Sequence, residues 1–203
     1  MALASRRQEA REPREMSKNR LESFSDGVIA IILTIMVLEL KVPQEPSLDA
    51  LGHLWPVYFA YLLSFANVFL MWISHHEIVA AVRTINYQLI FANGVTLFFM
   101  SLVPFAMAFS AETHWNAPLP VALYGIVMLL VCLAFVWFRF AAARHADNVA
   151  EAARQRTEAG ITLFFCSFFV GGSVAAFYMP RVSLFLYAAV PVLRLTYRGI
   201  RGD

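Results

Sequence analysis

The sequence predicts an all-α integral membrane protein with six transmembrane helices in each subunit. Of its 203 residues, 60% are apolar and only 15% are charged, which is too apolar for an ordinary soluble domain of this size. Several apolar stretches reach about 20 residues, the length that a helix needs to cross a hydrocarbon core of about 30 Å. The alternating strands of about ten residues that are typical of an outer-membrane barrel are absent from the sequence. Lipid is therefore the expected solvent.

The two ends of the chain differ from the middle in composition. Residues 1–19 interleave basic and acidic side chains that cannot bury themselves, so this segment is expected to be a cytoplasmic tail. It contains no apolar core of the kind that a cleavable signal peptide needs. Residues 20–198 are assigned to the six-helix transmembrane domain, and residues 199–203 to a short C-terminal tail.

The first two spans are bounded by proline and by aromatic residues. The first is expected over residues 20–41, because the two prolines of VPQEP forbid a continuing helix. The second is expected over residues 54–74, from the interfacial Trp55 to the interfacial Trp72. The segment HHEIVAAVR that follows is expected to be a polar connection.

Four further spans complete the set. The third, residues 85–110, contains Pro104, which removes a backbone donor and is expected to kink the helix. The fourth, residues 119–138, meets a charged helical pattern that predicts protrusion into the cytoplasm. The fifth and sixth are expected over residues 161–178 and 182–197.

Small residues and cysteines within these spans are interpreted as packing residues. Two pairs in the fifth span have the small-xxx-small spacing that lets helices approach closely: Gly171 with Ala175, and Gly172 with Ala176. The only two cysteines, Cys132 and Cys166, lack the spacing of a metal or redox pair and are expected to be core residues.

The distribution of positive charge predicts the orientation. With the N-terminus inside, fourteen of the sixteen Lys and Arg residues fall on the cytoplasmic side, and only Lys41 and Arg181 lie outside. Both termini are therefore expected in the cytoplasm. The formal charge of +2 is spread over short loops, which argues against nucleic acid as a partner.

The first span, RLESFSDGVIAIILTIMVLELK, has two different faces. At 100° per residue, four apolar side chains fall on one stripe, with a threonine about 60° to its side; these are Phe24, Ile31, Ile35 and Leu38, with Thr34. Ser25 and Asp26 point to the opposite side. Taken alone, such a stripe is typical of ordinary packing surface.

The polar residues at the start of the first span need partners, because unpaired polar groups are costly in a membrane. Arg20 and Asp26 lie on different faces and cannot pair with each other. We expect a buried polar network around Asp26, structural or gating in role. Its candidate partners lie at the ends of the second and third spans: His75, His76, Glu77, Arg83, Asn86 and Asn93. Adjacent histidines cannot face one metal from a single helix, so neither a metal site nor a cofactor is expected.

Several ordered motifs resemble a known family. Four residues spell R-x-x-x-F-S-D, the signature of the transmembrane protein 175 family of potassium channels: Arg20, Phe24, Ser25 and Asp26. W-x-x-H-H at Trp72, His75 and His76 is similar to the end of that family's second helix, and SLVPF at residues 101–105 is similar to its third. The resemblance covers the N-terminal half, and the second half matches only in hydropathy.

The resemblance implies a potassium channel of a prokaryotic cell membrane, built as a homotetramer whose four first helices surround the pore. It implies that Ile31, Ile35 and Leu38 form apolar constrictions and that Thr34 supplies a hydroxyl layer. A structural or gating network would comprise Arg20, Phe24, Ser25, Asp26, Trp72, His75, His76 and Asn93. Without a TVGYG-type carbonyl filter, preference for potassium over sodium is expected to be modest and to reflect the lower cost of dehydrating the larger ion.

Other functions remain open at this point. A secondary transporter or proton-permeable carrier of the same topology would need broken helices and charges near the midplane, and neither is evident. A non-conducting membrane scaffold could have the same apolar stripe, but water would never enter the space beside it. An enzyme would need convergent catalytic groups, for which residues 75–77 offer only a thin basis, so no enzymatic activity is expected.

Overall fold

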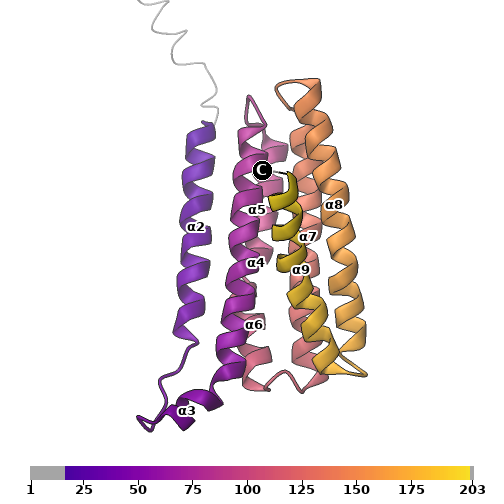
Figure 1. Cartoon of the computed structure of the whole chain (residues 1–203). Coiled ribbons are helices and arrows are strands. Elements are labelled where there is room, and N and C mark those ends of the chain that lie inside the picture. The colour runs from indigo at the N-terminus through magenta and orange to yellow at the C-terminus, as the bar shows by residue number, and fades with distance from the viewer. Residues whose placement is uncertain (1–16, 202–203) are drawn as a thin grey trace, which may run out of the picture.

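The computed structural model describes residues 17–201 as a bundle of long helices (Figure 1). The helices are α2 (Lys18–Leu38), α3 (Leu48–His53), α4 (Trp55–Ala80), α5 (Tyr87–Met100), α6 (Val103–Glu112), α7 (Pro118–Arg144), α8 (Val149–Ala175) and α9 (Pro180–Arg201). Of the tail assigned to residues 1–19, residues 1–16 lie outside the described residues, Ser17 directly precedes α2, and Lys18 and Asn19 already belong to α2.

Five segments are long and apolar enough to cross a membrane: α2, α4, α5 with α6, α7, and α8. The 22 residues of α9 extend over about 33 Å at 1.5 Å per residue. This helix is more polar, because Arg194, Arg198 and Arg201 lie in its second half, and it packs beside α8, α4 and α7. The predicted fold class, an all-α membrane protein with about six spans, is confirmed.

Several helix boundaries differ from the predicted ones. The helix α4 continues to Ala80, so the polar connection expected from residue 75 was wrong. The helix α8 begins at Val149, twelve residues earlier than expected, where the side chain of Asn148 accepts a hydrogen bond from Glu151 N (2.8 Å). The helix α9 runs to Arg201, beyond the expected start of the C-terminal tail. The reason is common to all three: a fall in hydropathy marks the membrane surface, and the backbone hydrogen bonds of the helix continue past it.

The third span is interrupted where proline was expected to disturb it. The helix α5 ends at Met100 and α6 begins at Val103, with Pro104 in its first turn. Proline is tolerated there because the first N–H groups of a helix have no intrahelical acceptor. The predicted kink is confirmed, as a break between two helices.

The helix α2 lies at one edge of the bundle, packed on α4, α5 and α6, while α8 lies at the opposite edge and α9 runs from the lower end of α8 toward the middle of the bundle (Figure 1). One end of the bundle gathers the start of α2, the α4–α5 turn, the α7–α8 turn and the end of α9. The two turns touch through a bridge between Val82 and Ala146, and Asp147 N donates to Ala81 O (3.2 Å). The segments predicted to be cytoplasmic thus share one end of the molecule.

A tyrosine of α9 fills the space left by two glycines. Tyr187 is fully buried, and its hydroxyl donates to Val121 O on α7 (3.0 Å). A methyl group at Gly125 or Gly172 would overlap the Tyr187 ring, whereas one at Gly171 would only touch Leu186. The close helix approach predicted from the small residues is therefore present at Gly172.

We expect Gly172→Ala to lower the midpoint of thermal unfolding, because the new methyl group overlaps the buried Tyr187 ring and overpacking costs about 1–3 kcal/mol. Gly160→Ala, on the exposed face of the same helix with no atom within 4 Å, is the matched control and should raise the midpoint slightly. Thermal unfolding of the purified protein in detergent measures both. Equal midpoints for the two variants would contradict this packing.

Candidate functional site

The helix α2 buries one face and leaves the other uncovered. The buried residues recur every three or four positions: Leu21, Ser25, Ile29, Ile32 and Met36. The opposite face carries Phe24, Ile31 and Leu38, which are 63%, 58% and 76% exposed, together with Thr34 and Ile35. The predicted stripe is thus a row of apolar side chains that no other helix of the described subunit covers.

Thr34 interrupts this apolar row with an oriented hydroxyl. Its Oγ1 lies 3.0 Å from Ala30 O and 2.9 Å from Ile31 O, so its single proton is directed back at the helix backbone. The oxygen lone pairs consequently remain available on the exposed side. Beside it, α2 and α6 border an open groove of about 560 Å³ lined by Ile31, Ile35 and Phe105 among others.

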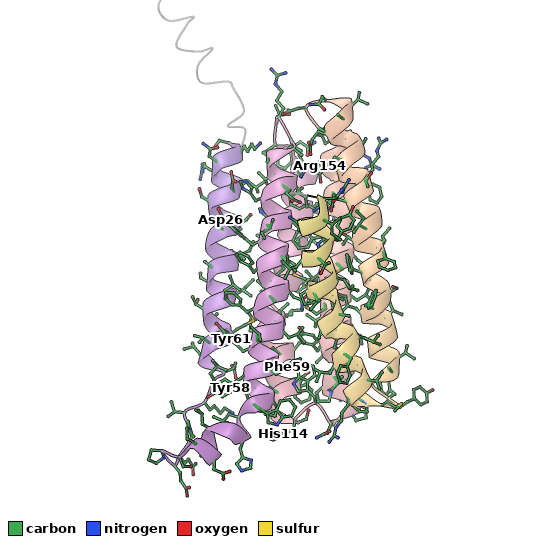
Figure 2. All side chains as sticks on the ribbon, in the orientation of Figure 1. Asp26, Tyr58, Phe59, Tyr61, His114 and Arg154 are labelled. Atoms are coloured by element: carbon green, nitrogen blue, oxygen red, sulfur yellow. The ribbon has the colours of Figure 1, made fainter. Side chains whose placement is uncertain are left out.

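The rotation of α2 is held by a ladder of polar contacts with α4. The two helices are antiparallel, and the contacts recur every four residues on both. They join Lys18 Nζ to Ala80 O (2.9 Å), His76 Nδ1 to Glu22 Oε1 (2.9 Å), and Trp72 Nε1 to Asp26 Oδ1 (2.8 Å; Asp26 is labelled in Figure 2). Each contact repeats the same helix register, so the three reinforce one another.

Behind this ladder, α2, α4 and α5 share a buried hydrogen-bonded trio. Ser25 Oγ donates to Leu21 O (2.8 Å) and therefore accepts from Asn93 Nδ2 (3.0 Å). Asn93 Oδ1 accepts from His75 Nε2 (2.7 Å), which fixes the Nε2–H tautomer of the imidazole. Ser25, His75 and Asn93 are all buried, so the trio ties three helices together without a formal charge.

The polar network thus has a different centre from the expected one. Its buried core is Ser25, His75 and Asn93, whereas the half-exposed Asp26 contacts Trp72. Glu22 is an additional member that the sequence reasoning did not assign. A signal existed: Glu22 and Asp26 have the same i, i+4 spacing as Trp72 and His76, which is the pattern of two antiparallel helices in contact.

Other candidate residues lie outside this network. Arg20 is exposed and its side chain makes no hydrogen bond or ion pair within residues 17–201, and Phe24 belongs to the exposed apolar row. Asn86 caps α5 by accepting from Leu89 N (2.9 Å) and contacts His145, and Arg83 is exposed in the turn. None of these four forms a hydrogen bond or an ion pair with Asp26 within the described residues.

Glu77 faces the opposite side of α4 and belongs to a charged cluster that sequence reasoning missed. Its carboxylate oxygens lie 2.7 Å and 3.1 Å from the guanidinium of Arg198, and Oε2 lies 3.2 Å from Arg139 Nη2. Arg139 is fully buried and also donates to Gln155 Oε1 (2.8 Å). The expectation that Glu77 joins the Asp26 network was wrong. Glu77 lies two residues after His75 on α4, so its side chain points to the other side of the helix, toward α7 and α9.

We expect Asn93→Leu to lower the midpoint of thermal unfolding substantially. The change removes the acceptor of His75 Nε2–H and the donor to Ser25 Oγ, and a buried polar group left unsatisfied costs about 1–3 kcal/mol. The control is Gln88→Leu, on the same helix at a half-buried side chain that makes no hydrogen bond within the described residues. Thermal unfolding that is equally insensitive to both changes would contradict the importance of the trio.

Glu77→Gln and Glu112→Gln compare a buried acidic residue with an exposed one. Loss of the Glu77 charge leaves Arg139 and Arg198 without their counter-charge and should cost about 3–5 kcal/mol of stability. Glu112 pairs with Lys41 at 3.0 Å, with both side chains mostly exposed, so its loss should cost less than about 1 kcal/mol. Unfolding midpoints in detergent measure the difference, and a reversed order would refute it.

The chain is similar to known channels. The family profile described as "Endosomal/lysosomal potassium channel TMEM175" matches residues 20–104. A protein named potassium channel from Chryseobacterium sp. (strain P1-3) is 36% identical over 183 residues, which cover 89% of this chain and 93% of that protein. The endosomal/lysosomal proton channel TMEM175 of Mus musculus is 34% identical over 115 residues, 49% of this chain and 23% of the mouse protein.

A solved structure shows the same architecture. The crystal structure of a lysosomal potassium-selective channel TMEM175 homolog from Chamaesiphon minutus superposes with a TM-score of 0.78 at 28% sequence identity. The match covers 92% of this chain and 98% of that one, so it includes the C-terminal helices beyond the family profile.

Proposed function

Because the chain belongs to the TMEM175 family, we propose that it is one subunit of an oligomeric potassium channel in a prokaryotic cell membrane. The observation that carries this proposal is the uncovered apolar row of α2, interrupted by the hydroxyl of Thr34. The match over nearly the full length of a bacterial protein named potassium channel supports it. Both termini are assigned to the cytoplasm on the distribution of positive charge.

A ring of subunits gives the uncovered row a role. In a homotetramer, four copies of α2 would face a central axis, and their apolar rows would line it. The neighbouring subunit would pack into the open groove between α2 and α6, beside the axis. Arg20 and Phe24, exposed at the cytoplasmic end of α2, would then face neighbouring subunits rather than their own.

The constriction is assigned to Ile31, Ile35 and Leu38. These side chains span about 10 Å along the helix axis at 1.5 Å per residue, enough for successive apolar rings. Narrow apolar rings keep a pore shut by excluding water, and a slight widening hydrates them. Thr34 would offer its lone pairs to a partly dehydrated cation within this zone. Potassium is favoured modestly, because its hydration shell is removed at lower cost than that of sodium.

The polar network would set the state of this constriction. Ser25, Asp26, Trp72, His75, His76 and Asn93 hold α2 at one rotation relative to α4 and α5. Rearrangement of these contacts would turn or shift α2, and the apolar rings would move with it. The network is thus proposed as the gating element rather than as an ion-binding site.

Proton conduction is a second candidate. The mouse relative, which matches about half of this chain, is named a proton channel. If the apolar rings were hydrated by a continuous chain of water molecules, the pore would conduct protons as well as metal cations. Reversal potentials under a pH gradient, with potassium equal on both sides, separate proton current from potassium current.

We expect Ile31→Asn to increase current through reconstituted protein, because a polar ring removes the barrier to hydration. Thr34→Ala should lower the permeability ratio of potassium to sodium roughly two- to tenfold, since one hydroxyl contact contributes about 0.5–1.5 kcal/mol. Currents in liposomes or planar bilayers under potassium and sodium gradients give both quantities.

The control is Ile126→Asn, the same change at an exposed apolar residue of α7. It should leave the current and the permeability ratio unchanged, because α7 lies away from α2. Absence of current from every folded variant would refute the channel assignment, and an equal effect of both asparagine substitutions would refute the placement of the pore.

A further inference from the structure

A small cavity lies within the subunit, on the opposite side of α4 from the α2 ladder. It has a volume of about 40 Å³, is partly open, and is lined by residues of α4, α7, α8 and α9. Its polar lining consists of Asn67, Ser74, Arg139, Thr162 and Arg194, and the rest is apolar. A space of this size holds about one to three water-sized particles.

The charged groups around this cavity do not balance. The cluster contains four arginines and two glutamates: Arg139, Arg194, Arg198 and Arg201, with Glu77 and Glu158. Glu77 is already bound by two of the arginines, and Glu158 lies 3.1 Å from Arg201 but 3.7 Å from Arg194. Within residues 17–201, two positive charges of this cluster therefore exceed its acidic groups. Arg139 and Arg194 are themselves buried, where an uncompensated charge is costly.

The two arginines that line the cavity also have unused hydrogen-bonding capacity. Arg139 is fully buried, and its Nε has no acceptor within the described residues. Among the described residues, the hydrogen bonds of the Arg194 side chain are both long, to Thr162 Oγ1 (3.4 Å) and Ser74 Oγ (3.3 Å). A guanidinium directs all of its N–H groups outward in one plane, so an acceptor in the cavity could receive donors from both side chains.

We propose that this cavity binds one small monovalent inorganic anion, of the size and charge of chloride, between Arg139 and Arg194. The anion supplies the missing negative charge and the missing acceptor at the same point. The small volume favours a monatomic ion over phosphate or sulfate, and the apolar walls favour a weakly hydrated ion. Bound there, the anion stabilises the packing of α4 against α7, α8 and α9, and it plays no part in cation conduction along α2.

Thermal unfolding in potassium gluconate, with potassium chloride added at constant ionic strength, tests this site. Chloride should raise the unfolding midpoint, and above the dissociation constant the rise should continue with the logarithm of chloride concentration, by roughly 2–4 °C for each kcal/mol of added stability. Arg139→Gln should abolish the rise. Arg156→Gln, at an exposed position of α8, should retain it. A rise that persists in Arg139→Gln, or no rise in the wild type, would contradict the proposal.

A second measurement does not depend on the variant folding. Crystals of the wild-type protein grown in bromide should show an anomalous peak in the cavity, within hydrogen-bonding distance of Arg139 and Arg194. Density for water alone in saturating bromide would overturn the proposal, whatever the ion currents of the protein.

Discussion

The hydrogen-bonded ladder between α2 and α4 is the interaction on which the rest of the site depends. It fixes the rotation of α2, and a shift of one residue turns a helical side chain by about 100°. Without that constraint, Ile31 and Thr34 would turn from the uncovered face toward neighbouring helices. The buried trio of Ser25, Asn93 and His75 opposes such a turn, because rotation would leave polar groups unpaired in the interior.

The fold was predictable wherever a single local property decided it. Apolar runs identified the spans, and Pro104 identified the break between α5 and α6, because its missing N–H acts at its own position. Helix ends were predicted poorly. The segments 75–80 and 149–160 lose hydropathy without losing helix, since side-chain polarity reports the membrane boundary while the backbone continues its own hydrogen bonding.

The site was predictable in part. The spacing of Ile31, Ile35 and Leu38 identified one face of α2, and that face is uncovered in the subunit. The hydrogen-bond partners of the polar residues were harder to predict, because they depend on the rotation and axial position of one helix relative to another. Glu77 shows the difficulty: its neighbours are His75 and His76, but its ionic partner Arg198 lies 121 residues away in the chain. A contact between residues so far apart in the chain cannot be predicted from the sequence around either one.

The most direct test of the central claim is the accessibility of position 34 in the assembled protein. Thr34→Cys would be introduced with Cys132 and Cys166 replaced by alanine, and current recorded while a charged, water-soluble thiol reagent is applied. If α2 lines the pore, modification should block or alter the current, and Phe164→Cys on the outer face of α8 should remain insensitive. Labelling of position 34 by a lipid-soluble reagent alone, with current unaffected by the charged reagent, would place this face of α2 in the lipid and contradict the account.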